Sequence, residues 1–404
     1  MAERLAVDGG VPVRSAPFPR WPQWDDEERT ALHQVLDSGE WWSMAGGQVT
    51  AFVHEFAEAH QASHGVGCTN GSAALEICLR AMDIEWGEEV ITSSYSFIAT
   101  ANAALLVGAV PRFADVLPGT WNLDPSHVEQ LITPRTRAII AVHIGGEPAD
   151  MDALRRIAGQ HGIVLIEDAA QAHGAAWRGQ RVGAIGDMGT FSFQSSKNVT
   201  AGEGGMVLTN SEDWYERCWS VVNVGRKPGG AFYDHVGLAS NYRLTEWQAA
   251  VLRVQLTRLF DLNRRRQHSA AYLRTGMAEI EGLDMIPGDP RVTDDACHLL
   301  RLHYEPRAFG ERTTADFVRA MRAEGVPIGR GYIEPFGSQA MILRETAKIC
   351  GRLGLAVPED GPWPVCADIC ENGLWLHHAM LLGDEADLDD ILRAAAKVKA
   401  AWAG

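Results

Sequence analysis

Two residues in the middle of the chain, Lys197 and Asp168, have the side chains and the settings of a covalent catalytic site. Lys197 lies in a serine-rich turn that leads into the glycine-rich run 202–205, with few other charges nearby, and Asp168 ends an apolar strand-like segment. A lysine amine can bond to the aldehyde of pyridoxal phosphate, while a carboxylate keeps the pyridine nitrogen protonated. A partly dry site would lower the lysine pKa, so that the amine is neutral for part of its cycle. The pair predicts an aminotransferase.

Three further features could contact the same phosphorylated ring. Residues 69–72 (TNGS) separate a strand from a helix, so backbone N–H groups and the Ser72 hydroxyl could approach a phosphate. An aromatic residue within 93–97 (SSYSF) could stack on the ring, and Gln171 could reach its phenolic oxygen. Residues 69–72 could instead form a helix N-cap, and the aromatic residue within 93–97 could instead pack in the core. Asp168 itself could be a helix cap. Their occurrence in one order favours the cofactor.

The strand and helix signals alternate from about residue 62 to residue 210. Apolar strands are expected near 65–69, 89–92, 110–116, 136–142, 163–168, 189–193 and 205–209, with helices over 72–82, 100–107 and 151–161. Such alternation predicts an α/β fold with a mainly parallel sheet covered on both faces. Because ligands bind at the carboxyl ends of strands in such sheets, Asp168 stands at the expected edge.

The remaining segments define the predicted domain organisation. Residues 1–22, rich in proline and glycine, are expected to form an irregular arm, followed by a large domain over 23–265 and a smaller C-terminal α/β domain over 266–404. Helices are expected from 25–28 onward and over 245–277. The basic run 264–266 in the second of these is interpreted as a solvated helix face.

Composition narrows the class of partner. The chain has 404 residues and a formal charge of 36 − 52 = −16, which disfavours nucleic acid and anionic membranes as partners. The apolar runs are too short to cross a bilayer, and residues 1–5 lack the core of a signal peptide, so a cytoplasmic location is expected. The seven cysteines are scattered, and only Cys366 and Cys370 are close in sequence. Free thiols and no metal site are expected.

Three sequence blocks carry a family resemblance. These are 167–174 (EDAAQAHG), 197–205 (KNVTAGEGG) and 240–248 (SNYRLTEWQ). Found in this order, they resemble the DegT/StrS-type aminotransferases of sugar and cyclitol biosynthesis, and the similarity extends over essentially the whole chain. The resemblance implies a fold type I aminotransferase, with a mainly parallel seven-stranded sheet between helices in the large domain.

The resemblance also assigns roles to individual residues. It implies that Lys197 bonds to pyridoxal 5′-phosphate, that Asp168 pairs with the pyridine nitrogen and that Gln171 contacts the ring oxygen. Phe97 would stack on the ring. Gly71, Ser72 and Ser192 would bind the phosphate, and Asn241 would reach the phosphate of the neighbouring subunit's cofactor. An obligate homodimer with shared active sites follows from the last assignment, although Asn241 could equally mark a helix N-terminus.

The substrate contacts are predicted from side-chain chemistry. Arg243 could bind the carboxylate of an L-glutamine or L-glutamate donor, because a guanidinium matches a carboxylate in a two-pronged hydrogen bond. His377 and His378 could bind ring hydroxyls, although neighbours on a strand face opposite sides, so only one is expected in the site.

Residues 41–44 (WWSM), Gln194 and 375–378 (WLHH) resemble the branch that aminates keto-cyclitols or related keto-sugars in antibiotic biosynthesis. One alternative is an aromatising 3-amino-5-hydroxybenzoate synthase-like dehydratase, although those enzymes often carry His in place of Gln171. A second alternative is a non-catalytic partner subunit of the same fold, which the intact Lys197, Asp168 and Ser192 disfavour.

Overall fold

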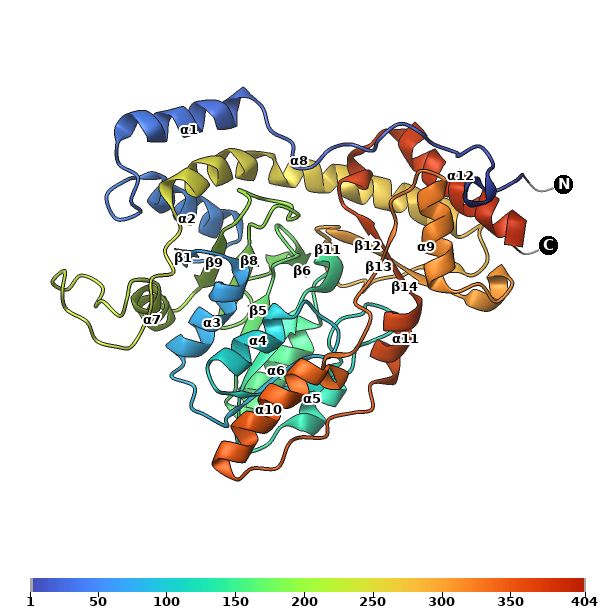
Figure 1. Ribbon diagram of the computed structural model, residues 1–404. Helices are drawn as coiled ribbons and strands as arrows, with labels where there is room; N and C mark the ends of the chain where they lie inside the picture. The colour runs from blue at the N-terminus through green and yellow to red at the C-terminus, as the bar shows by residue number, and fades with distance from the viewer. Residues whose placement is uncertain (1–2, 403–404) are drawn as a thin grey trace.

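The computed structural model of the chain describes residues 3–402 and is built around a seven-stranded mixed sheet (Figure 1). Its strands are β1 (His64–Cys68), β2 (Glu89–Ser93), β3 (Val110–Ala114), β4 (Thr136–Val142), β5 (Val164–Asp168), β8 (Met188–Ser192) and β9 (Gly205–Thr209). They are arranged in the order β1-β9-β8-β5-β4-β2-β3. Strands β8, β5, β4, β2 and β3 are parallel, and β9 runs antiparallel to both of its neighbours. The predicted seven-stranded, mainly parallel sheet is therefore confirmed.

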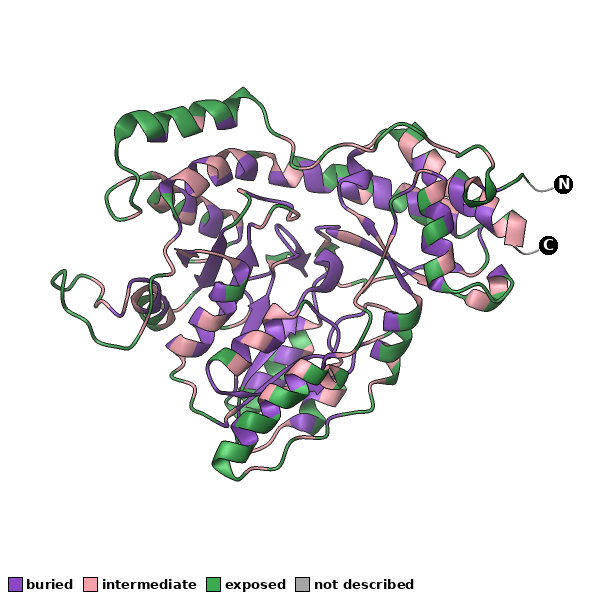
Figure 2. Cartoon of the chain, in the orientation of Figure 1, coloured by how far each residue is buried: buried purple, intermediate pink, exposed green. Residues whose placement is uncertain are grey.

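Helices cover both faces of this sheet, as the alternating pattern predicted. One face packs against α2 (Gln48–Ala59), α5 (Pro125–Leu131), α6 (Met151–His161) and the first half of α8 (Glu246–Met277). The other face packs against α3 (Gly71–Ala81), α4 (Ala99–Leu106) and α7 (Glu212–Val222). Successive side chains of a strand point to opposite faces, so Ile139 joins the first core and Ile140 the second. The sheet is accordingly purple, that is buried, in Figure 2.

A second, antiparallel sheet forms the smaller C-terminal unit. It contains β10 (Leu283–Met285), β12 (Leu299–Tyr304), β14 (Gly373–His377) and β13 (Gly329–Arg330), in that order. Its core includes residues of α9 (Thr314–Ala323), α12 (Glu385–Trp402) and the second half of α8. A third, three-stranded sheet joins β11 (Val292–Asp294), β6 (Ala176–Trp177) and β7 (Gln180–Arg181).

The C-terminal third also returns to the large sheet. Helix α10 (Ala340–Leu353) packs on the β3 side, where Ile342 contacts the Phe113 cluster and Ile349 contacts Val110. Helix α11 (Pro364–Asn372) packs between the two sheets, with Ile369 beside Trp121. The segment predicted as the small domain, 266–404, thus contributes two helices to the surroundings of the large sheet.

The two helices expected near 25–28 and 245 begin at capping boxes. Helix α1 (Asp26–Ser38) starts after Asp25, and α8 starts after Thr245, and in each case the cap and the third helical residue exchange hydrogen bonds. Residues 9–25 form an irregular arm that leads from α9 and α12 to α1 along α8 (Figure 1). Within residues 3–402, no helix has the length and apolar composition needed to cross a membrane.

One prediction about α8 was wrong. Arg264 and Arg265 are exposed, but Arg266 is completely buried, donates to Asn263 Oδ1 over 2.9 Å and lies 5.1 Å from the centre of the Trp21 ring. Its burial lowers the pKa of Arg266 to about 9. The basic run is therefore not a uniform solvated face, since its third residue belongs to the interior between the arm and the helix.

Candidate active site

Asp168 is fixed as a hydrogen-bond acceptor at the carboxyl end of β5. Its Oδ2 accepts from the hydroxyl of Thr100, the second residue of α4, over 2.8 Å, and its Oδ1 accepts from the Ala170 N–H over 3.2 Å. The Thr100 oxygen in turn lies 2.9 Å from the Ser96 hydroxyl, which must donate because the Thr100 proton points to Asp168. Two donors stabilise the ionised carboxylate, which is the form needed beside a protonated ring nitrogen.

Lys197 stands in the turn between β8 and β9, beside the end of β5. The turn is closed by hydrogen bonds from Lys197 N to Gln194 O and from Ser195 N to Gly202 O. The Gln194 side chain tightens it further, since its Oε1 accepts from Ser196 N and from Ser196 Oγ. Lys197 is half-buried, and burial lowers the pKa of its amine to about 8, while the nearby Asp168 carboxylate opposes this shift. A neutral, nucleophilic amine is therefore within reach near neutral pH.

The predicted phosphate residues converge at the start of α3. A side chain on Gly71 would place its Cβ only 2.6 Å from Ser192 Cβ, so Ser192 lies directly against the helix N-terminus. Asn70 caps the helix by accepting from Ala73 N, and Ser72 is exposed in the first turn. The first N–H groups of a helix have no partner within the helix and favour an anion. The arrangement matches a phosphate cradle.

Gln171 and Phe97 are, beside Asp168, the two ring contacts predicted from the sequence. The Gln171 Oε1 accepts from Gly145 N over 2.7 Å, which fixes the amide so that its N–H groups face Tyr332 Oη, 3.4 Å away. An amide N–H group in this place could also donate to the phenolic oxygen of a pyridoxal phosphate ring. Phe97 follows β2, and its side chain is 57% exposed, in contrast to the buried Tyr95 two residues earlier. Of the aromatic residues within 93–97, Phe97 is thus the one with an open ring.

Asn241 and Arg243 lie on the segment that precedes α8, where Arg243 forms an isolated bridge with Cys68 at the end of β1. Asn241 is exposed and forms an isolated bridge with Asn223 at the base of the loop 224–240. The Arg243 guanidinium is 5.8 Å from the centre of the Trp42 ring, and burial together with Arg226 lowers the pKa of Arg243. Its Nη1 is buried without a partner among the described residues. Both side chains therefore keep unused hydrogen-bonding capacity.

The two histidines at the end of β14 differ in their surroundings. His377 is half-buried and its Nδ1 lies 3.3 Å from Ala379 N, whereas His378 is fully buried and its Nε2 lies 2.9 Å from the Ser196 carbonyl oxygen. The two rings nevertheless lie beside each other, with 4.2 Å between their centroids, so they do not point to opposite sides as expected for neighbours on a strand. His378 therefore stands behind the Lys197 turn rather than at an open surface, and of the two only His377 retains a partly exposed side chain for a substrate.

Several residues of the site carry no sequence signal of their own. Thr100 holds Asp168, Tyr332 meets Gln171, and Trp21 donates from its Nε1 to the Lys197 carbonyl oxygen over 3.1 Å. Asn198 is buried next to Lys197 and binds Ala296 O and His298. All of these contacts join residues that are distant in sequence, so only the assembled fold reveals them.

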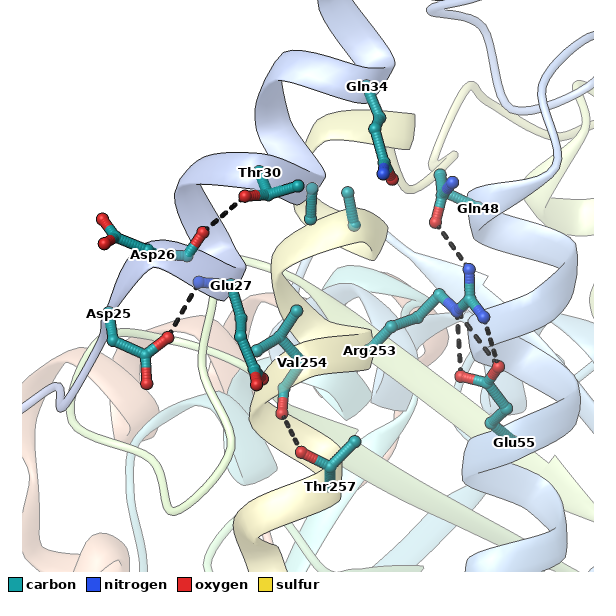
Figure 3. Close-up of a pocket in the computed structure, with 12 residues that line it drawn as sticks. Asp25, Asp26, Glu27, Thr30, Gln34, Gln48, Glu55, Arg253, Val254 and Thr257 are labelled. Atoms are coloured by element: carbon teal, nitrogen blue, oxygen red, sulfur yellow. Dashed lines mark hydrogen bonds and ion pairs between the residues drawn. The ribbon is translucent and has the colours of Figure 1, made fainter.

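A separate cavity of about 830 Å³ lies between α1, α2 and α8 and includes none of these residues (Figure 3). Its lining is mainly acidic and amide side chains, among them Asp25, Asp26 and Glu27. Arg253, the cation among its lining residues, is held by both carboxylate oxygens of Glu55 at 2.7–3.1 Å. With its charge already matched, this cavity offers no site for a phosphate or a carboxylate.

Comparison with known proteins decides the family. The model of the DegT/DnrJ/EryC1/StrS aminotransferase family matches residues 22–395. The chain belongs to this aminotransferase family. It is 39% identical, over 409 residues, to a protein of Streptomyces kanamyceticus that bears the name L-glutamine:3-amino-2,3-dideoxy-scyllo-inosose aminotransferase, with 99% of this chain and 98% of that protein covered.

Two further relatives show how this DegT/DnrJ/EryC1/StrS aminotransferase relates to neighbouring activities. It is 38% identical to the 3-amino-5-hydroxybenzoate synthase of Amycolatopsis mediterranei, with 93% of this chain and 96% of that protein covered. The solved structure of a 3-amino-5-hydroxybenzoic acid synthase superposes with a TM-score of 0.87 at 34% identity, covering 96% of this chain and 100% of the other. The fold is therefore that of fold type I aminotransferases, which use pyridoxal phosphate.

The residues present fit pyridoxal phosphate. Gly71 leaves beside Ser192 the space that a Cβ would fill, both oxygens of the Asp168 carboxyl group are fixed by hydrogen bonds, and Lys197 has a lowered pKa. When bound, the cofactor supplies an aldehyde for the amino group and a ring that accepts electrons. Asp168 and Gln171 would then hold the ring, and Lys197 would move the protons.

Proposed function

We propose that the protein transfers an amino group from L-glutamine or L-glutamate to a keto-cyclitol in the biosynthesis of an aminoglycoside-like antibiotic. The observation that carries this proposal is the full-length similarity to enzymes named for L-glutamine and scyllo-inosose derivatives, at 37–39% identity. A keto-sugar is a weaker candidate acceptor of the same chemistry. A cytoplasmic location is proposed with it.

The donor site would use Arg243. Its guanidinium has an unmatched charge and a buried Nη1 without a partner among the described residues, and a carboxylate would satisfy both. Arg226 adds a second positive charge, since it contributes to the lowered pKa of Arg243. In the shared-site arrangement that the family resemblance implies for Asn241, the carboxylate they bind would belong to a donor held in the site of a second copy.

A homodimer with shared active sites is proposed for the same reason. The loop 224–240 projects from the body next to α7 and is almost entirely exposed (Figures 1 and 2). It carries Phe232, Tyr233, Val236 and Leu238, the last two 62% and 96% exposed, near the exposed Trp42. Exposed apolar groups of this number mark an interaction surface. Asn241 at its base would then reach the cofactor phosphate of the partner.

Subunit mixing tests the shared site. Neither Lys197→Ala nor Asn241→Ala should be active alone. When the two variants are unfolded, mixed and refolded together, a hybrid dimer in which each site uses Lys197 of one chain and Asn241 of the other contains one intact site. Recovery of about a quarter of the wild-type activity is expected from random pairing, since half of the dimers are hybrids. No recovery, with a dimer confirmed by light scattering, would place Asn241 in its own subunit's site or in none.

The activity is tested by half-reactions. The protein is loaded with pyridoxal phosphate and mixed with L-glutamine or L-glutamate, and the visible band of the lysine-bound cofactor is followed as it gives way to that of pyridoxamine phosphate. Conversion identifies the donor. The aminated protein is then challenged with scyllo-inosose, 2-deoxy-scyllo-inosose and a nucleotide-linked keto-sugar, and return of the visible band identifies the acceptor. A return only with the nucleotide-linked sugar would overturn the keto-cyclitol assignment.

An aromatising reaction is the second candidate. The similarity to 3-amino-5-hydroxybenzoate synthase, in sequence and in structure, favours it. In that reaction a hydroxylated cyclic ketone would lose water and gain aromatic absorbance without any amino donor. A stable visible band in the presence of amino acids, together with release of an aromatic product, would establish this candidate. A protein that forms no visible band would instead be a non-catalytic member of the fold.

A further inference from the structure

Two consecutive carbonyl groups of the Lys197 turn are held by side chains from opposite ends of the chain. His378, which follows β14, places its Nε2 2.9 Å from the Ser196 carbonyl oxygen. Trp21, in the N-terminal arm, places its indole Nε1 3.1 Å from the Lys197 carbonyl oxygen. Hydrogen bonds within the turn leave these two carbonyls free, so the side chains supply the missing donors.

The two side chains also pack against one another. The Trp21 ring meets the His378 ring edge-on, with 4.6 Å between the centroids and an angle of 83°. The buried Arg266 guanidinium covers the Trp21 ring at 5.1 Å, and His298 stacks on His378 at 5.4 Å. Close packing of this kind restricts the rotamers of both donors. The back of the Lys197 turn therefore rests on a packed aromatic surface rather than on solvent.

The hydrogen bond to Ser196 determines which ring nitrogen of His378 carries a proton. A backbone carbonyl only accepts, so the Nε2 of His378 carries the proton that is donated to Ser196. Burial, and then the charge of Arg266, hold the pKa of His378 well below its usual range, so its Nδ1 carries no proton. A neutral imidazole with this one tautomer gives the turn a donor without placing a second charge beside Lys197.

The next residue of the turn is anchored as well. Asn198 donates from Nδ2 to the Ala296 carbonyl oxygen over 2.8 Å, and its Oδ1 accepts from His298 Nδ1 over 3.0 Å. Residues 196, 197 and 198 are thus held by the segment after β14, the N-terminal arm and the segment before β12. With the carbonyls of residues 196 and 197 and the side chain of Asn198 held, the Lys197 amine has little freedom except about its own side-chain bonds.

We propose that His378 and Trp21 are positioning residues that aim the Lys197 amine at the cofactor aldehyde carbon. This proposal rests on the proposed function. Reacting groups held in the right geometry gain several powers of ten in rate, and a displacement of about 1 Å can cost about 100-fold. Neither side chain touches the reacting atoms, so they position the amine through the Ser196 and Lys197 carbonyls.

The test compares variants that keep the ring or the donor. Trp21→Phe keeps an aromatic ring and removes the N–H, His378→Leu removes the donor, and His378→Gln returns an N–H near the position of Nε2. Trp86→Phe, in the exposed connection before β2, and His303→Leu, on β12, are the matched controls. Each full-length protein is stripped of cofactor, and its thermal midpoint is measured by circular dichroism.

Two steps of cofactor binding are then followed separately. Quenching of tryptophan fluorescence reports non-covalent binding of pyridoxal phosphate, and growth of the visible band, confirmed by borohydride reduction and mass spectrometry at Lys197, reports covalent capture. Because Trp21→Phe and Trp86→Phe each remove a fluorophore, binding to these two variants is measured by equilibrium dialysis. Turnover with the active donor gives kcat and KM.

We expect Trp21→Phe and His378→Leu to slow covalent capture and kcat by about 10- to 100-fold, with little change in KM or in non-covalent affinity. His378→Gln should recover most of the rate, and the controls should match the wild type. Wild-type capture rates in both donor-free variants, or a loss that His378→Gln does not relieve at an unchanged thermal midpoint, would overturn the proposal. If the wild type captures the cofactor but no amino donor converts it, the proposed function fails, while the capture rates still decide the role of these residues.

Discussion

The pKa of Lys197 predicts how the cofactor-free protein should react with amine reagents as the pH is changed. Burial lowers this pKa from about 10.5 to about 8. At pH 7, about one amine in ten is then neutral, compared with about one in 3,000 for an ordinary lysine, a ratio of about 300. Because only the neutral amine is nucleophilic, labelling of Lys197 should rise with pH through a midpoint near 8 and level off above it.

Replacement of Asp168 by asparagine should move this midpoint in a known direction. The Asp168 carboxylate favours the protonated amine and so raises the Lys197 pKa against the effect of burial. Asp168→Asn removes the charge and keeps the shape, so the midpoint should shift below 8 and labelling at pH 7 should become faster. The same variant should lose most of its transamination rate, because the ring nitrogen would have no charged partner.

The assay uses brief exposure of the cofactor-free protein to an acylating reagent between pH 6 and pH 11, followed by peptide mass spectrometry. A short lysine peptide in the same tube corrects for the reagent's own pH dependence. Folding across the range is checked by circular dichroism. A wild-type midpoint near 10 would refute the argument from burial, and an unchanged or raised midpoint in Asp168→Asn would refute the argument that these two groups interact.

Three other variants probe the remaining contacts of the site. Gly71→Ala would force a Cβ to within 2.6 Å of Ser192 Cβ, and overpacking of about 1–3 kcal/mol should weaken the affinity for pyridoxal phosphate about tenfold or more, as measured by equilibrium dialysis. Thr100→Val removes the hydroxyl donor to Asp168, and a hydrogen bond to a charged group contributes about 1.5–3 kcal/mol, so kcat should fall about 10- to 100-fold. An unchanged kcat would mean that the hydrogen bond from Ala170 N is enough to hold Asp168. Lys197→Ala should bind the cofactor without forming the visible band and should not turn over, and steady-state transamination by this variant would contradict the role given to Lys197.

The parts of the site that could be predicted from sequence are those set by local pattern. Asp168 and Ser192 end two neighbouring parallel strands, and parallel strands place their carboxyl ends at one edge of a sheet. A glycine-rich turn after the second strand then brings Lys197 to the same edge. The apolar alternation of strands and helices therefore contained enough information for the fold class and for this pair.

Arg266 shows where the local interpretation was too coarse. A run of three arginines is usually solvated, yet Arg266 lies seven residues after Leu259 and seven before Leu273, both of which are fully buried. Seven residues are close to two helical turns, so these three side chains share one face of α8. The helical periodicity thus indicated that Arg266 is buried, whereas the charge of the run 264–266 suggested a solvated face.

Tyr332 and Trp21 could not be found in this way. Each contacts a partner more than 160 residues away, namely Gln171 and Lys197, and each lies in an irregular segment without periodicity. Their positions depend on how the arm and the small sheet dock on the large one. A contact of this kind is a property of tertiary packing, which no short window of sequence specifies.

The lowered pKa of Lys197 depends both on the local sequence motif and on tertiary packing. The motif 197–205 supplies the lysine and the turn, but the shift in pKa comes from burial, and burial is produced in part by segments outside the motif. Trp21 from the arm and His378 from the small sheet close the back of the turn, and each donates to one of its carbonyls. The reactivity of the central lysine therefore depends on both ends of the chain, so changes in either end that leave the motif intact should still alter its chemistry.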